Sequence, residues 1–298
     1  MDPQIDAATF NNLFVSRLDT ADGLEKAAQA GGAFVRERLR EVSFARSILP
    51  PEYLTKADCQ RSVNHDTLVK IVDIEPQSSA AAVNFRGKTH ERYIESDRYE
   101  IPFFKIESDK FKKNEAELLA YDYPVTKVIE ENSVKDIQKI EDGKFIEFTD
   151  AVIAANGKTI APAAAGPATS ENLVKLFKAL DTDELAVGTI LMHKADWDDF
   201  MTQEGAVIGS PLASEILVNG YKYNTILGHK LVVTIKSSIV VPGTLYIFTD
   251  PKYLGNFYIL NDTKFYIEKR GDMVSWQTWE YVGMGYGNLR AAAKMTLT

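Results

Sequence analysis

The stretch His193–Asp199 gathers the densest set of side chains that could do chemistry. One histidine and the carboxylates of Asp196, Asp198 and Asp199 fall within seven residues. Such a group could bind a metal ion or act as an acid/base pair. A helix start explains it equally simply, with His193 at the cap and the acids facing the positive end of the helix dipole. We favour the helix start because no second group of ligands elsewhere completes a site.

Two glycine motifs also resemble functional signatures. The stretch Gly283-Met284-Gly285-Tyr286-Gly287 resembles a glycine-rich loop, but a dinucleotide site needs a following helix, and the remaining residues resemble a strand. Glycines in a strand more often mark a bend or a close approach of the backbone. Arg270-Gly271-Asp272 matches a cell-adhesion tripeptide, and its place between two strands favours a turn.

The other reactive side chains are isolated. Cys59 is the single cysteine, which excludes an internal disulfide and a cysteine zinc site, and we interpret it as a plain thiol in a reducing compartment. His65, His90 and His229 show no partner pattern. Arg86-Gly87-Lys88 predicts a turn whose basic tip is exposed or lies between subunits. We therefore predict no catalytic residue, no cofactor and no metal.

Composition limits the class of protein further. The 298-residue chain is 45% hydrophobic, as expected of a chain with a real core, and has a net charge of −8 at pH 7. Binding to nucleic acid needs clustered Lys and Arg, so a surface that grips it is disfavoured. No apolar run is long enough to span a membrane, and the first residues do not resemble a signal peptide.

The first third of the chain predicts helices and then strands. Residues 1–50 predict two helices, separated at Gly31-Gly32 and stopped by Pro50-Pro51. Residues 60–110 switch to an alternation of period two and predict a long β excursion. Its expected strands are 67–74, 80–85, 92–94 and 99–106. A two-stranded ribbon is marginal in water, so we expect it to lie on a partner surface.

The remainder predicts a long helix, an α/β block and a terminal sheet. The long helix is expected to begin at Asp122 and Pro124 and to end near Gly143, before a shorter apolar segment. The small-residue loop 156–169 marks the best internal boundary. Further helices are expected from Ser170, over 193–201 and from Ser210. Strands are expected over 187–192, 231–235, 244–249, 257–260, 264–267 and 273–286, with Asn261-Asp262 as a turn.

The order of these parts resembles the major capsid protein of tailed bacteriophages, which has the Hong Kong 97-type fold. The stretches that carry the likeness are 44–51, 60–106, 123–143, 190–197, 228–234, 243–250 and 283–293. The resemblance implies an α+β fold in five segments. These are an N-terminal arm (1–59), an extended β-hairpin loop (60–110), a peripheral domain with a spine helix (111–155), an axial α/β domain (156–262) and closing strands of the peripheral domain (263–298).

The resemblance implies a structural function and no enzyme activity. Subunits would assemble as hexamers and pentamers into the icosahedral capsid of a virion, in the host cytoplasm, around double-stranded DNA and away from membranes. Portal, scaffolding and decoration proteins would be further partners. The arm starts close to Met1, which favours a separate scaffolding protein or none. The expected subunit contacts are Phe85, Arg86 and Lys88 in the loop and Phe10, Phe14 and Arg46 in the arm.

Two alternatives remain open. The nearer one is an encapsulin-type nanocompartment shell protein, which shares the fold class and encloses an enzyme. The other, from a different class, is a metal-dependent hydrolase using His193, Asp196 and Asp198, which would need further ligands from elsewhere in the chain.

Overall fold

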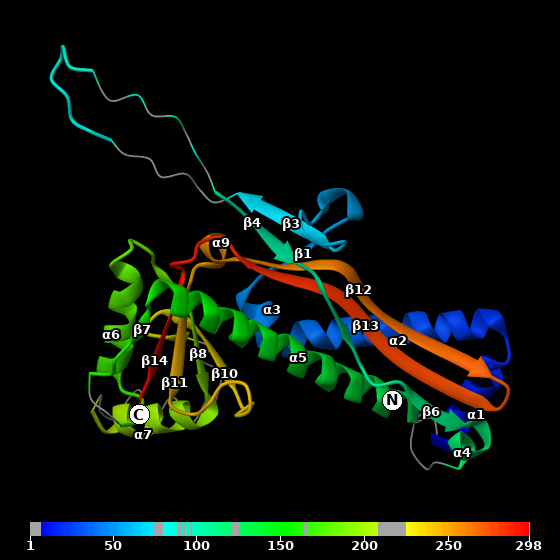
Figure 1. Cartoon of the computed structure of the whole chain (residues 1–298). Coiled ribbons are helices and arrows are strands. Elements are labelled where there is room, and N and C mark those ends of the chain that lie inside the picture. The colour runs from blue at the N-terminus through cyan, green and yellow to red at the C-terminus, as the bar shows by residue number, and fades with distance from the viewer. Residues whose placement is uncertain are drawn as a thin grey trace.

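The computed structural model describes residues 7–73, 80–88, 91, 93, 95, 97–120, 125–163, 166–207 and 225–297. Within these residues the chain has a mixed α+β fold with three sheets. Figure 1 shows two lobes bridged by a long helix and a long strand pair, with one loop projecting away from both lobes.

A five-stranded sheet, called here the peripheral sheet, is built on one long hairpin. Its strands are β1 (Pro51–Tyr53), β12 (Gly255–Arg270), β13 (Met273–Tyr286) and β5 (Phe104–Glu107) in that order, with β6 (Phe111–Asn114) also paired to β13. The hairpin turns at Gly271, whose φ is 62°, so the predicted turn is confirmed. The predicted turn at Asn261-Asp262 is wrong, because β12 continues through it with shifts of register, as in a β-bulge.

Two long helices, α2 (Ala21–Val42) and α5 (Val125–Asn156), cover one face of this sheet. Both are longer than predicted. α5 has 32 residues and passes Gly143, because its buried stripe continues beyond that residue through Phe145 and Ile153. α2 passes Gly31-Gly32, where a Cβ on Gly31 would lie 2.7 Å from the Phe265 ring. That glycine pair therefore serves a close helix–strand approach instead of breaking the helix.

Short helices complete the peripheral lobe. They are α1 (Ala7–Leu18), α3 (Phe44–Ile48) and α4 (Glu115–Leu119). Val15 and Leu18 of α1 pack with Leu118 of α4 and Trp276 of β13 at the far end of the hairpin. The expected start of the long helix at Asp122 and Pro124 lies outside the described residues.

A six-stranded sheet, called here the axial sheet, forms the second lobe. Its order is β7 (Thr159–Ile160), β14 (Ala292–Thr296), β11 (Thr244–Thr249), β8 (Val187–His193), β10 (His229–Thr234) and β9 (Thr225–Ile226). It packs with α6 (Ser170–Asp181) and α7 (Lys194–Val207), and α9 (Pro251–Leu254) leads back to β12. The helix expected from Ser210 lies outside the described residues.

The sheets do not follow the predicted segment boundaries. β14 belongs to the predicted closing strands of the peripheral domain, yet it pairs with β11 in the axial sheet. β12 begins at Gly255, within the predicted axial segment, yet it pairs with β13 in the peripheral sheet. The chain thus crosses between the lobes more often than a linear division into segments suggests.

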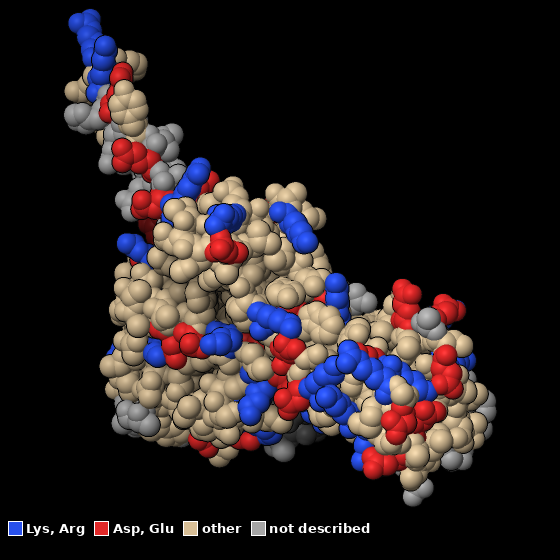
Figure 2. Space-filling model, turned by 45° about the vertical axis from the view of Figure 1, so that its right-hand side comes forward, with Lys and Arg blue, Asp and Glu red and all other residues tan. Residues whose placement is uncertain are grey.

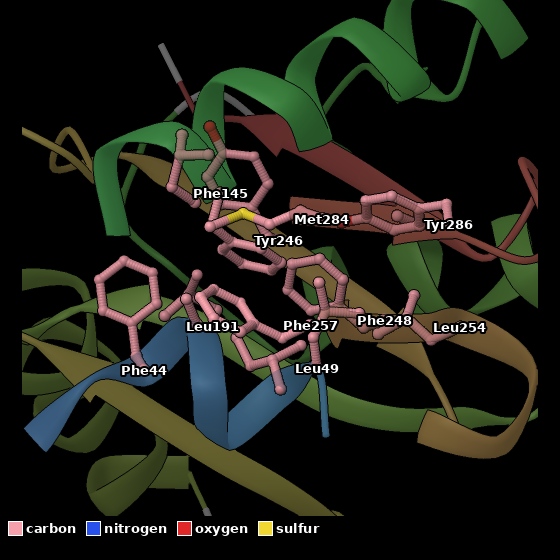
Figure 3. Close-up of a cluster of buried hydrophobic side chains, with 14 of the residues drawn as sticks. Phe44, Leu49, Phe145, Leu191, Tyr246, Phe248, Leu254, Phe257, Met284 and Tyr286 are labelled. Atoms are coloured by element: carbon pink, nitrogen blue, oxygen red, sulfur yellow. The ribbon is translucent and has the colours of Figure 1, made fainter. Parts of the chain in front are cut away.

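One hydrophobic cluster connects both lobes (Figure 3). Its side chains come from α2, α3, α5 and strands of both sheets. The labelled members are Phe44, Leu49, Phe145, Leu191, Tyr246, Phe248, Leu254, Phe257, Met284 and Tyr286. The Phe145 ring lies between those of Phe44 and Phe248, at centroid distances of 6.2 and 5.5 Å. A shared core of this size makes the two lobes one packed body.

A third sheet carries the projecting loop. It consists of β2 (Gln60–Arg61), β3 (Leu68–Asp73) and β4 (Arg98–Pro102), and the short 3₁₀ helix η1 (Lys56–Asp58) precedes it. The strand predicted over 80–85 is wrong, because residues 80–84 lie in no strand. The turn beside it is confirmed, since the Gly87 amide donates to the Asn84 carbonyl at 2.7 Å.

Candidate functional site

The His193–Asp199 stretch forms the start of α7, as predicted. His193 Nδ1 accepts a hydrogen bond from the Ala195 amide at 3.1 Å. Asp196 Oδ1 accepts one from the Gly243 amide at 2.8 Å, and burial raises the pKa of this carboxyl. Asp198 faces solvent and pairs with Lys194 at 2.7 Å. These side chains cap and brace a helix instead of converging on one point.

The hydrolase alternative gains no support from this geometry. Asp198 pairs with Lys194, and Asp196 accepts its hydrogen bond from Gly243 in the β10–β11 connection. Across the part of the chain that the structure describes, no group of three or more His, Cys, Asp or Glu side chains could hold a metal ion. A catalytic metal would need ligands beyond those that the structure brings together.

The other singled-out residues are also structural in this fold. Gly285 lies in β13, where a Cβ would overlap Ile101 Cδ1, so the predicted close approach is confirmed. Cys59 is a half-buried thiol packed near the same Ile101, and burial raises its pKa, which disfavours a reactive thiolate. His229 packs edge-on against Phe177, and His65 is exposed. His90 lies outside the described residues.

The best candidate for a functional surface is the tip of the projecting loop. Phe85 is 112% exposed by comparison with an extended reference chain, and Arg86 and Lys88 beside it are exposed as well. Val83 and Tyr93 are exposed on the same loop. Three large apolar side chains exposed on one protruding loop make this loop the candidate surface for a contact.

The expected arm contacts have a different placement. Phe14 of α1 is half-buried and packs inside the subunit against the cluster that α1, α4 and the β12–β13 hairpin form. The Phe10 side chain is outside the described set. Arg46 lies in the interior, not on a surface: its guanidinium is 2.5 Å from Glu141 and 2.9 Å from Glu280. It therefore joins the arm to α5 and β13 within one chain.

This buried charge cluster was missed from the sequence. Thr263 Oγ1 also donates to Glu280, at 2.9 Å, so four elements meet there. Burial and the neighbouring carboxylate of Glu280 raise the pKa of Glu141 well above its usual range. One signal was available in the sequence: Glu141 falls on the apolar stripe of α5, between Ile137 and Phe145. A charge in that position predicts a buried partner.

A second polar contact fixes the arm beside it. Asp142 Oδ1 accepts hydrogen bonds from Ser43 Oγ at 2.9 Å and from the Ala45 amide at 3.1 Å. Its other oxygen pairs with Lys236 at 2.5 Å. The start of α3 is thus held against α5 and against the connection that follows β10.

Comparisons in sequence find no relative: no protein-family model matches the chain, and no curated protein matches it. Solved structures do match its fold. The capsid of a native GTA particle is 15% identical with a TM-score of 0.57, covering 85% of this chain and 89% of that chain. The mature capsid of bacteriophage PhiM1 is 8% identical with a TM-score of 0.57, covering 86% and 87%. A virus-like particle from Pyrococcus furiosus is 16% identical with a TM-score of 0.53, covering 91% and 98%.

These similarities define a capsid fold that spans nearly the whole chain. It is the Hong Kong 97-type α+β fold of tailed-phage capsids, as the sequence resemblance implied. None of the described helices is long and apolar enough to cross a bilayer.

Proposed function

We propose that the chain is the structural subunit of an icosahedral capsid of a tailed bacteriophage. Subunits assemble into hexamers and pentamers, in the host cytoplasm, and the closed shell encloses double-stranded DNA. In this shell the chain is divided into an N-terminal arm, an extended loop, a peripheral domain with its closing strands, and an axial domain. The boundaries between these segments follow the sheets described above. Portal, scaffolding and decoration proteins are its further partners.

The observation that carries the proposal is the projecting loop on a capsid fold. Its tip presents the fully exposed ring of Phe85 beside Arg86 and Lys88. Covering a phenyl side chain with a neighbouring subunit contributes about 1.5–3 kcal/mol, which is repeated at every contact of a closed shell. The net charge of −8 also suits a container that must not grip its polyanionic contents.

Assembly of the purified protein tests the proposal. Negative-stain microscopy with light scattering should show uniform hollow particles. Their diameter should be roughly tens of nanometres, as in a closed shell of many subunits. A chain that stays at its monomer mass of 33.2 kDa at every concentration, with crowding agents and beside phage scaffolding or portal proteins, contradicts it.

One second candidate has an observation in its favour. The similarity to the virus-like particle from Pyrococcus furiosus covers 91% of this chain, so a particle that is not described as a phage capsid has the same fold, which favours keeping the encapsulin-type compartment as the alternative. The contents of purified particles separate the two functions. Nuclease-resistant double-stranded DNA supports the phage capsid, and an enclosed protein without DNA supports the compartment.

A further inference from the structure

The space between α5 and the peripheral sheet holds two apolar clusters with a polar layer between them. On β13, Trp276 belongs to the cluster at the far end of the hairpin, and Val282 belongs to the cluster that connects both lobes. Thr278 and Glu280 lie between these two residues, and alternate residues of a strand point to the same face. Both side chains are therefore directed toward the helices, and both are 0% exposed.

The other side of this layer is formed by α5. The helix packs with the first cluster through Ile129 and with the second through Ile137. Ser133 lies one helical turn from each of them, on the same row of side chains, and is buried. Because α5 contacts β13, Ser133 comes to the level of Thr278 and Glu280, between the same two clusters.

Four buried polar atoms at this level make no hydrogen bond with a described residue. They are Ser133 Oγ, Thr278 Oγ1, Glu280 Oε1 and, at the border of the layer, Trp276 Nε1. The hydroxyls and the indole can donate, and the carboxylate oxygen can accept. A buried polar atom without a partner is costly, and in folded proteins most such atoms are paired with protein groups or with ordered water.

The spacing along β13 suits a bridging molecule of the size of water. Residues two apart on a strand are separated by roughly 6.6 Å. Two hydrogen bonds of about 2.8 Å each, in series, span most of that distance. The other oxygen of Glu280 already accepts from Arg46 and from Thr263, both at 2.9 Å, so Oε1 is the atom left to accept. Water can donate to that oxygen and accept from the hydroxyls at the same time.

Figure 2 shows Lys, Arg, Asp and Glu side chains gathered on the surface of the lobe away from the loop, where bulk water surrounds them. Glu280 lies below that surface, so a partner for its second oxygen must lie inside the protein. We propose that the polar layer is a binding site for ordered water, in which a water molecule bridges Glu280 Oε1, Thr278 Oγ1 and Ser133 Oγ. This water joins α5 to β13 at a second point, about two helical turns from Glu141. The site lies within one subunit and is independent of the proposed function.

Removing one hydroxyl tests the site. Thr278→Val keeps nearly the same shape and takes one partner from the bound water, so Tm should fall by about 2–4 °C. Thr249→Val is the matched control, because Thr249 is also 0% exposed in a strand and its hydroxyl donates to the Ala186 carbonyl at 2.7 Å. The two falls should be similar. An unchanged or higher Tm for Thr278→Val would overturn the inference, since removing an unpaired hydroxyl from a dry interior costs nothing.

A structure of the full chain, at a resolution that shows water, provides the second measurement. Density should lie within about 2.5–3.0 Å of Glu280 Oε1 and Thr278 Oγ1, and it should weaken or disappear in Thr278→Val. Density with about six oxygen ligands would instead identify a metal cation. An interior without density at this place would identify a dry contact. Either of these two results would overturn the inference, whether or not the chain forms particles.

Discussion

At the scale of single residues, the Arg46–Glu141–Glu280 cluster is the most consequential feature. Two carboxylates share one guanidinium in a site that bulk solvent does not reach. Burial and the neighbouring carboxylate of Glu280 raise the pKa of Glu141, which favours the protonated form of its carboxyl in this cluster. The negative charge of the cluster is compensated only while Arg46 is present.

Arg46 and Glu141 should therefore respond unequally to substitution. We expect Arg46→Met to lower the free energy of unfolding by about 3–5 kcal/mol, because it strands two buried acids. Glu141→Gln should cost less than about 1.5 kcal/mol, because Arg46 keeps Glu280 as its partner. Urea unfolding at pH 7 measures both. Lys26→Met, which breaks an exposed pair with Asp22, is the control and should change stability little. Equal losses in the two buried variants would contradict this balance.

Glu130 gives a pH-dependent prediction. Burial raises its pKa from 4.5 to about 7, so between these values the folded chain holds a proton that the unfolded chain has lost. Its contribution to stability is present below pH 4.5 and decreases as the pH rises to 7. Glu130→Gln should remove this decrease. Unfolding free energies at pH 5 and pH 8 measure it, with the exposed Glu25→Gln as control. If Glu130→Gln loses as much stability between pH 5 and pH 8 as the wild type does, the prediction is wrong.

At the scale of elements, the contact between the loop sheet and the peripheral sheet depends on a missing side chain. A Cβ at Gly285 would overlap Ile101, which is 2% exposed. We expect Gly285→Val to destabilise the fold by roughly 1–3 kcal/mol or more through overpacking. Adding Ile101→Ala should recover part of the loss, because it vacates the same space. Thermal unfolding of the three variants checks this, and a double variant no better than Gly285→Val would contradict it.

Gly143 is the opposite case. It lies inside α5, and a Cβ there would meet nothing within 4 Å. Gly143→Ala should stabilise the chain by about 0.5–1 kcal/mol, because alanine restricts the unfolded state and favours the helix. A rise of a few degrees in Tm is the expected readout. A fall would mean that this helix position needs the flexibility of glycine.

These elements show where sequence reasoning succeeds. Continuous runs of apolar, β-branched and aromatic residues located β8 and the whole of β13, because both strands are buried along most of their length. Sequence reasoning failed where local signals were overridden by packing. Gly31-Gly32 and Gly143 signal a helix end, yet α2 and α5 are held by the sheet beneath them. Likewise, arginine is a residue type that usually lies on the surface. Arg46 is buried because Glu141 and Glu280, which are far from it in the sequence, pair with it in the interior.

At the scale of the whole molecule, the loop should matter for assembly and little for folding. Its described residues between 80 and 88 are all exposed, so their removal leaves the core intact. Replacing 81–88 by a short Gly-Ser linker should give a soluble subunit with nearly unchanged Tm and no particles. Circular dichroism and light scattering measure the two properties. Normal particles from this variant would show that the loop is dispensable.

The same loop has its two ends anchored on opposite edges of the peripheral sheet. One limb leads through β3 and β2 to β1, which borders β12, and the other leads through β4 to β5, which borders β13. Tension applied at the tip therefore divides between two strands and pulls both lengthwise against their neighbours. Hydrogen bonds loaded in this shearing way break together instead of one by one. A pull on the loop is thus resisted at both edges of the peripheral sheet at the same time.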